Sequence, residues 1–336
     1  PMSARRQRQM CIRDRDHARQ PFVPTDEHEL DARAAEILQI QATGLARRMQ
    51  AAHSQAMVIG LSGGLDSTLA FLVAFDALQK LDLAPHQLHA ITMPGPGTSS
   101  GTHSNAHALA TAVQAHLEEI PIDAAVEQHL ADLKHGGDFD VVFENAQARE
   151  RTQILFNYAN KVGGIVVGTG DLSELALGWC TFNADHMANY NVNASVPKTL
   201  IAYLVRWYAQ HRAGAHPQLG DVLQRVLDTP ISPELIPPQN DEISQLTESL
   251  VGPYELHDYF LYHFLRHGSR PNKIYQLACR SFESVYSASE IAHWLGQFFQ
   301  RFISQQFKRT TLPPGPKVGS VSSVSYTHLT LPTSTH

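Results

Sequence analysis

Short apolar runs alternate with longer amphipathic segments through the first half of the chain. The continuously apolar run at 57–61 is typical of a strand covered on both faces in a parallel sheet, 88–93 and 165–168 are further strand-like runs, and 119–122 is another strand candidate. Longer segments with apolar residues at helical spacing predict helices over 26–49, 65–78, 103–117 and 143–161. This alternation predicts an α/β fold with a doubly wound parallel sheet flanked by helices.

The second half of the chain and the two ends have a different pattern. Past residue 198 the sequence predicts helices and loops, and residues 228–240 contain four prolines, which exclude regular secondary structure. That segment is interpreted either as a loop that closes over a site or as a linker. Residues 1–20 are arginine-rich and 322–336 are Ser/Thr-rich, and neither follows a helical or strand period. We therefore expect one folded domain over 21–321, with ends that are disordered or foreign to the protein.

Composition narrows the class of protein. The 336 residues are 43% hydrophobic and 17% charged, with a net charge of −6, which is an ordinary balance for a soluble globular protein. The mildly acidic charge argues against a nucleic-acid partner, and no apolar run is long enough to span a membrane or to form a secretory signal. The three cysteines have no paired or metal-type spacing. We therefore expect a cytoplasmic protein without membrane contact.

A glycine turn separates the first predicted strand from the helix that follows it. Ser62, Gly63 and Gly64 carry small side chains or none, and Asp66 opens the next apolar segment. The free N–H groups at the start of that helix, and its positive end, would face an anion placed there. The turn lacks Gly-Lys-Ser/Thr, so it differs from the mononucleotide-kinase loop. It predicts a site for nucleotide phosphates, and a simple glycine turn capped by Asp66 is the alternative.

Three further segments carry polar residues that could meet this turn. Residues 168–171 follow another predicted strand, with Glu174 one turn into the next helix. Because ligands bind beyond the carboxyl ends of parallel strands, both turns are predicted at the same edge of the sheet. Asn145 and Arg149 are four residues apart and share a helix face, and Lys198 begins a helix. Taken singly, these features also have structural explanations: a helix cap, a polar pair and an exposed lysine.

Together, these segments resemble NAD⁺ synthetase, specifically the synthetase half of the glutamine-dependent enzymes. The most specific match is the run Val-Gly-Thr-Gly-Asp-Leu-Ser-Glu-Leu-Ala-Leu-Gly-Trp at 167–179, and Ser-Gly-Gly-Leu-Asp-Ser at 62–67 resembles the pyrophosphate loop of enzymes that split ATP into AMP and pyrophosphate. The matching stretches run in order at 60–68, 92–95, 143–153, 163–181, 190–200, 229–238, 251–265 and 306–319. The resemblance implies the adenine-nucleotide alpha-hydrolase-like fold of the PP-loop ATP pyrophosphatases.

The resemblance also implies a reaction and a set of residues for it. The reaction is the ATP-dependent amidation of deamido-NAD⁺ to NAD⁺ through an adenylated intermediate, with release of AMP and pyrophosphate. Asp66 and Glu174 would hold Mg²⁺, Asp66 without forming a salt bridge, and with Lys198 they are the candidate catalytic residues. The residues implied to contact ATP are Gly60, Leu61, Ser62, Gly63, Gly64, Leu65, Asp66, Ser67, Thr169 and Lys198. Those implied to bind deamido-NAD⁺ are Asn145, Arg149, Glu174, Trp179, Cys180, Thr181, Phe182 and Lys308.

Two features depart from the pattern of the glutamine-dependent enzymes. No nitrilase-like glutaminase domain is recognisable, so ammonia is the expected nitrogen donor, unless a glutaminase absent from this chain supplies it. The family pattern also stops at about residue 321. The resemblance further implies a homodimer or larger homo-oligomer. Two alternatives stay open: another adenylating ligase of the PP-loop type, such as a GMP or argininosuccinate synthetase, and a fragment without catalytic competence.

Overall fold

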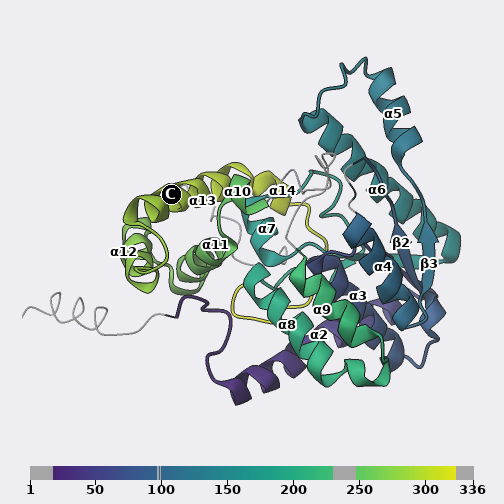
Figure 1. Ribbon diagram of the computed structural model, residues 1–336, viewed down its shortest axis with the longest axis horizontal. Coiled ribbons are helices and arrows are strands. Elements are labelled where there is room, and N and C mark those ends of the chain that lie inside the picture. Colours follow the sequence, from purple (N-terminus) through teal and green to yellow (C-terminus); the bar gives the residue numbers. More distant parts are fainter. Residues whose placement is uncertain (1–17, 97, 99, 230–246, 323–336) are drawn as a thin grey trace, which may run out of the picture.

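A five-stranded parallel sheet forms the centre of the computed structural model, which describes residues 18–96, 98, 100–229 and 247–322 (Figure 1). Its strands lie in the order β3–β2–β1–β4–β5, with the bounds β1 Ala56–Gly60, β2 Leu88–Thr92, β3 His116–Glu119, β4 Gly164–Gly168 and β5 Tyr190–Asn191. Every pairing is parallel, and Met57 lies opposite both Leu88 and Ile165. The strand order reverses at β1, which makes the gap between β1 and β4 the expected ligand site. The predicted doubly wound α/β fold is confirmed.

Helices cover both faces of this sheet. The helices of the described residues have the bounds α2 Glu27–Ala51, α3 Leu65–Lys80, α4 Ser100–Ala112, α5 Asp123–Asp132, α6 Val141–Val162, α7 Leu172–Leu177, α8 Lys198–His211, α9 Leu219–Asp228, α10 Thr247–Val251, α11 Tyr254–Leu261, α12 Pro271–Ser281, α13 Ala288–Ser304 and α14 Gln306–Arg309. Successive strand residues face opposite sides: Met57 and Ile59 join the core built with α2, α3, α8 and α9, whereas Val58 and Val166 pack against α6. This alternate burial explains why β1 is apolar at every position.

The third strand and the helix before it differ from the prediction. Helix α4 ends at Ala112 rather than at 117, and β3 covers His116–Glu119 rather than 119–122. The helix ends because Gln114 adopts a left-handed conformation (φ +59°) and the Ala115 N–H donates back to the Ala110 carbonyl at 3.0 Å. Leu117 belongs to the strand. The apolar residues at 119–122 reflect packing instead, because Ile122 is buried between α5 and α6.

A second hydrophobic core lies beside the sheet, in the group of helices α11, α12 and α13 (Figure 1). Its largest buried side chains are aromatic: Tyr259, Phe260, Phe282, Phe298 and Phe302. Helix α7, which follows β4, also buries its apolar residues in this core and packs on α11 and α13. The position of α7 is therefore fixed by its packing in this second core.

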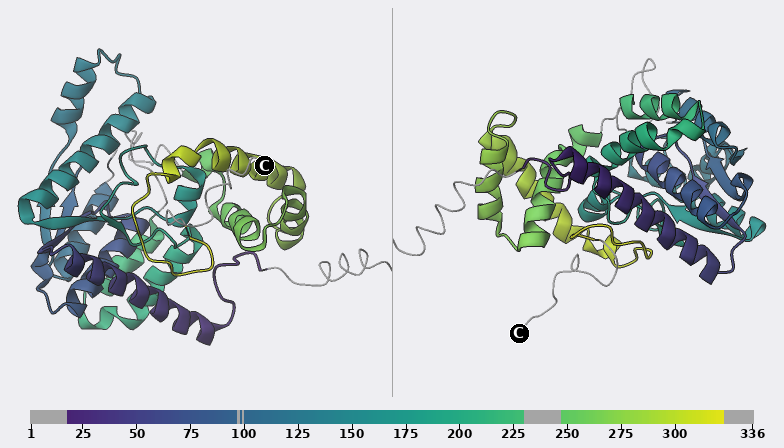
Figure 2. Two further views of the ribbon diagram at one scale, coloured as in Figure 1. Left: turned by 180° about the vertical axis from the view of Figure 1, so that it is seen from behind. Right: turned by 90° about the horizontal axis from the view of Figure 1, so that it is seen from below.

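The chain after α14 runs back along the molecule as an extended segment, drawn in yellow in Figure 2. The Asn191 N–H donates to the Pro314 carbonyl at 2.9 Å, and the Ser195 hydroxyl donates to the Pro316 carbonyl at 2.7 Å. These bonds attach the segment to β5 and to the loop before α8. Among the described residues, no helix is long and apolar enough to cross a membrane. The predictions for the two ends, and for the proline-rich segment from residue 230, lie outside the described residues apart from 18–20 and 322.

Candidate active site

The turn after β1 leaves the start of α3 open to the cavity. Gly64 is the N-cap of α3 and no side chain caps the helix, so the alternative in which Asp66 serves only as a cap is not what the structure shows. The Gly64 N–H donates to the Ser62 hydroxyl at 3.2 Å, and the hydroxyls of Ser62 and Ser67 lie 3.0 Å apart. Gly63 has φ +83°, and a Cβ there would lie 2.0 Å from the Thr102 carbonyl oxygen. This turn therefore requires glycine at 63 and presents N–H and O–H groups to an anion.

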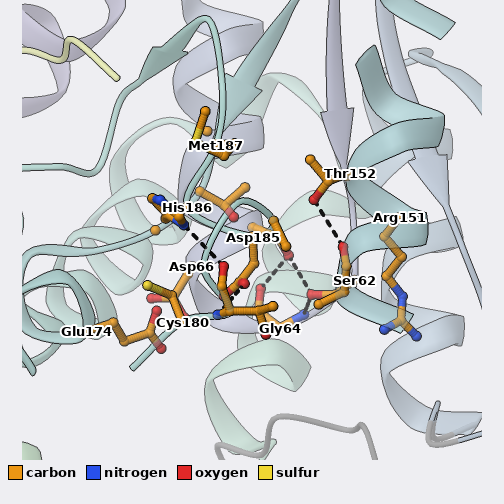
Figure 3. Close-up of a pocket in the computed structure, with 18 of the residues that line it drawn as sticks. Ser62, Gly64, Asp66, Arg151, Thr152, Glu174, Cys180, Asp185, His186 and Met187 are labelled. Carbon is orange, nitrogen blue, oxygen red and sulfur yellow. Dashed lines mark hydrogen bonds between the residues drawn. The ribbon is translucent and has the colours of Figure 1, made fainter. Parts of the chain in front are cut away.

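A cavity of about 700 Å³ lies at the carboxyl ends of β1, β2 and β4 (Figure 3). Its size is that of a small-molecule site. The predicted site residues that line it are Gly60, Leu61, Ser62, Gly64, Leu65, Asp66, Ser67, Asn145, Arg149, Thr169, Glu174, Trp179, Cys180, Thr181, Phe182 and Lys308. Gly63 and Lys198 lie behind this lining. Residues from segments far apart in the sequence thus meet at the reversal point of the sheet.

Three carboxylates surround one lysine at the base of this cavity. The Lys198 ammonium lies 2.7 Å from Asp66 Oδ2, 2.7 Å from Asp171 Oδ2 and 2.8 Å from Glu174 Oε1. The side chains of Lys198 and Asp171 are 3% and 0% exposed, whereas Asp66 and Glu174 keep 24% and 23%. Lys198 is therefore buried beneath the two carboxylates that face the cavity, and Asp66 does form a salt bridge. The salt bridge differs from the prediction for Asp66, and the burial of Lys198 excludes the alternative of an exposed lysine.

Burial sets the protonation of this cluster. Desolvation raises the pKa of Asp66 to about 6, and the Asp171 charge adds to it, against the opposing effect of Lys198. Desolvation, followed by repulsion from Asp171, raises the pKa of Glu174 well above its usual range. Burial alone would lower the pKa of Lys198, but the combined charges of Asp171, Asp66 and Glu174 raise that pKa well above its ordinary value. When all three carboxylates are ionised, the cluster carries more negative charge than one lysine balances, so a second cation favours the ionised form.

The donor set of this cluster fits Mg²⁺. One oxygen from each of Asp66, Asp171 and Glu174 lies within 4.8 Å of the others. Among the described residues, Asp66 Oδ1 is buried and has no hydrogen-bond partner, while its other oxygen contacts Lys198. Magnesium prefers carboxylate oxygens and keeps several water ligands, so a partly exposed group of this kind suits it. Figure 3 shows Asp66 and Glu174 in the same part of the cavity.

The starts of α3, α7 and α8 carry the cluster, and Asp258 of α11 ties α7 to α8. Asp171 caps α7 by accepting from the N–H groups of Ser173 and Glu174, at 2.7 and 2.9 Å. Asp258 accepts from the Ser173 hydroxyl and from the N–H and hydroxyl of Thr199, next to Lys198. The predicted site omitted Asp171 and Asp258. The capping pattern of 168–174 signals Asp171, but no local pattern connects Asp258 to α7 and α8.

The predicted dinucleotide residues meet at the other end of the cavity. The Thr181 hydroxyl donates to Asn145 Oδ1 at 2.8 Å, which joins α6 to the loop after α7. Lys308 donates to the carbonyls of Gly178 and Cys180, at 2.9 and 2.6 Å. Its ammonium thus fixes the loop 178–182 while the side chain borders the cavity.

Two residues that sequence reasoning missed also line this end. Asp185 accepts from the Thr181 N–H at 2.7 Å, and burial raises the pKa of this carboxyl to about 6. His186 contacts the Thr181 carbonyl at 3.2 Å and the Thr311 hydroxyl at 3.1 Å. Figure 3 labels both residues among those that line the cavity. They contact Thr181 of the predicted dinucleotide group, in a loop with no periodic pattern that could have marked them.

Comparison with known proteins decides the family. Residues 37–294 match the family model described as NAD synthase. The chain belongs to the NAD synthase family. It is 44% identical over 335 residues to the glutamine-dependent NAD(+) synthetase of Mycobacterium tuberculosis, a match that covers 93% of this chain and 49% of that protein. The chain therefore spans about half the length of the curated relatives it matches.

Solved structures of NAD synthetases share the fold. A glutamine-dependent NAD(+) synthetase from Cytophaga hutchinsonii matches with a TM-score of 0.70 at 19% identity, over 84% of this chain and 51% of that one. An NH3-dependent NAD synthetase from Campylobacter jejuni matches with a TM-score of 0.53 at 20% identity, over 75% of this chain and 94% of that one. The fold is therefore that of the PP-loop synthetases of the NAD synthase family.

Proposed function

We propose that this chain catalyses the ATP-dependent amidation of deamido-NAD⁺ to NAD⁺, with ammonia as the nitrogen donor. The nicotinate carboxylate attacks the α-phosphorus of ATP and pyrophosphate leaves. Ammonia then attacks the carbonyl carbon of the mixed anhydride, AMP departs and one proton is lost. The observation that carries this proposal is a single cavity that joins a glycine-lined anion loop, the two carboxylates Asp66 and Glu174 of the cluster, and the residues predicted to bind a dinucleotide.

The phosphate end of the cavity supports the first step. Residues 62–67 offer the free N–H groups of α3 and the hydroxyls of Ser62 and Ser67 to the leaving pyrophosphate. Groups fixed in this way stabilise charge that develops as the bond to the α-phosphorus breaks. Thr169, at the end of β4, borders the same space and would contact ATP. The reaction needs alignment and charge neutralisation more than covalent help from the protein.

The carboxylate cluster supports binding of the metal-bound triphosphate. Asp66 and Glu174 would hold Mg²⁺, with Asp171 behind them, and the ion when bound would offset the negative charge of the phosphates. Lys198 balances part of the carboxylate charge in the ligand-free cluster and prevents mutual repulsion. If Mg²⁺ binds Asp66 and Glu174, the ammonium loses part of its attraction to them. Lys198 would then contribute positive charge toward ATP, as the family resemblance implies.

The far end of the cavity supports binding of the acceptor. Trp179 lines the cavity with the Arg301 guanidinium 5.0 Å from its ring, and an indole can cover a pyridine ring. Arg149 also lines it, on the helix face that carries Asn145. Its positive charge would contact deamido-NAD⁺, which carries a pyrophosphate and a carboxylate. These groups orient the nicotinate carboxylate toward the phosphate end of the cavity.

The products of the reaction test this proposal. The chain is incubated with deamido-NAD⁺, ATP, MgCl₂ and ammonium chloride, and products are separated chromatographically. NAD⁺, AMP and pyrophosphate are expected in equal amounts. Formation of ADP would contradict adenylation, and AMP formation with xanthylate or citrulline but not with deamido-NAD⁺ would assign the chain to another ligase of this fold. Failure to bind ATP in the presence of Mg²⁺ would favour a fragment without catalytic competence.

A further inference from the structure

A second group of metal-type ligands lies beside the nucleotide cavity, between α4 and β3 (Figure 1). His103 and His107 are four residues apart on α4, so their side chains share one face of the helix. Glu119 is the last residue of the neighbouring strand β3. Both histidine Nε2 atoms point at the same carboxylate oxygen, Glu119 Oε2, at 2.7 and 2.9 Å.

The geometry of this group is close to that of a zinc site. One atom from each of His103, His107 and Glu119 lies within 4.8 Å of the other two. Ligand atoms held about 2.0–2.2 Å from a tetrahedral zinc ion lie roughly 3.3 Å from one another. The two nitrogen–oxygen distances must therefore lengthen by a few tenths of an ångström. Such a change requires only small rotations of exposed side chains.

The chemistry of this group also differs from that of the carboxylate cluster. Two imidazoles and one carboxylate are the donors that zinc, copper and nickel prefer, whereas Mg²⁺ prefers oxygen ligands alone. In the described part of the chain, the ion pairs of Glu119 are with the two histidines and not with a lysine. The three side chains are 37–41% exposed, which leaves room for a water molecule as a fourth ligand.

We propose that His103, His107 and Glu119 form a binding site for a divalent transition metal, with zinc the expected ion. Each imidazole binds through the Nε2 lone pair and carries its proton on Nδ1. Glu119 then exchanges two hydrogen bonds for one bond to the metal. His103 also lines the nucleotide cavity, and the carbonyl of its neighbour Thr102 lies against Gly63. The ion would therefore lie at the edge of the cavity, next to the phosphate loop but outside the carboxylate cluster.

Zinc binding to the full chain tests this proposal directly. The protein is stripped of metal with a chelator, dialysed, and titrated with Zn²⁺ by calorimetry in excess MgCl₂, which occupies the carboxylate cluster. The unmodified chain is expected to bind one equivalent of zinc that the variant H103A/H107A does not bind. The single variants H103A and H107A and the variant E119Q should each weaken it at least about tenfold. Cobalt, as a spectroscopic probe, should give the visible absorption of a low-coordinate nitrogen and oxygen site in the unmodified chain but not in H103A/H107A.

Matched variants separate this site from binding by other histidines, of which the chain has 19 in all. His129→Ala removes an exposed histidine of α5, and Glu118→Gln alters the neighbouring residue of β3, whose carboxylate contacts His116 at 3.4 Å. Both should bind zinc as the unmodified chain does. Equal zinc stoichiometry and affinity in H103A/H107A and the unmodified chain would overturn the proposal. Circular dichroism and the melting temperature check folding, and His107→Gln replaces any alanine variant that does not fold.

Discussion

The carboxylate cluster around Lys198 and the histidine group on α4 both lie at the carboxyl edge of the sheet, but their surroundings differ. In the first, Asp171 and Lys198 are almost fully buried, and three carboxylates share one ammonium. In the second, the side chains are about two-fifths exposed and Glu119 accepts from two imidazoles. Burial makes unbalanced charge costly, so the first cluster needs a permanent cation, whereas solvent screens the second. The comparison predicts that substitutions in the carboxylate cluster have large effects on activity and stability, and that substitutions in the histidine group have small ones.

The largest effect is expected from Asp66→Asn. The amide keeps the shape of the side chain but removes the negative charge that would hold Mg²⁺, so kcat should fall by at least about 10²–10³-fold. The melting temperature should change little, because the asparagine still accepts from Lys198. Asp138→Asn, at an exposed position between α5 and α6, is the matched control. Equal kcat values in the two variants would show that the charge of Asp66 is not needed for the reaction.

Lys198→Met should mainly destabilise the fold. It leaves three carboxylates without their shared cation, and breaking a buried ion pair in this way costs about 3–5 kcal/mol. Chemical denaturation measures the loss, with Lys273→Met on the exposed face of α12 as the control. Added Mg²⁺ should raise the melting temperature of Lys198→Met more than that of the unmodified chain. An equal rise in the melting temperature of both proteins on adding Mg²⁺ would show that these carboxylates do not bind the metal.

Gly63→Ala tests the contact between the two regions. A methyl group at 63 would meet the Thr102 carbonyl, one residue before His103, and the backbone there has φ +83°. We expect a cost of about 1–3 kcal/mol in the free energy of unfolding and a higher KM for ATP. Gly101→Ala is the control, because no atom lies within 4 Å of its added Cβ. If Gly63→Ala and Gly101→Ala have the same free energy of unfolding and the same KM for ATP, the phosphate turn and α4 are not in rigid contact.

The smallest effect is expected from Glu119→Gln. Hydrogen bonds from His103, and then from His107, lower the pKa of Glu119, so its contribution to stability is present above its ordinary pKa and is lost as the pH falls below that value. Because the group is well exposed, the change at pH 7 should stay within about 0.5 kcal/mol. Denaturation curves at pH 7 and pH 4 measure it. A loss of several kcal/mol would show that this group, like the buried cluster, supports the fold.

Local sequence patterns predicted the sheet and the phosphate turn because each depends on neighbours along the chain. The strand 57–61, the glycines after it and the cap of α7 are of this kind. The third strand was misplaced because β3 lies at the sheet edge, half-buried, with polar residues at three of its four positions. The buried position of Lys198 and the role of Asp258 could not be predicted, since both depend on where α8 and α11 pack. Likewise, His103 and Glu119 meet only because α4 packs beside β3.

Transfer of an oxygen label tests the central claim of this account, that the carboxylate of the acceptor is adenylated in this cavity. Deamido-NAD⁺ labelled with ¹⁸O in its nicotinate carboxylate is converted with ATP, Mg²⁺ and ammonium, and AMP is analysed by mass spectrometry. One labelled oxygen should appear in each AMP, and the amide of NAD⁺ should retain the other. Unlabelled AMP, formed together with NAD⁺, would contradict attack of the carboxylate on the α-phosphorus.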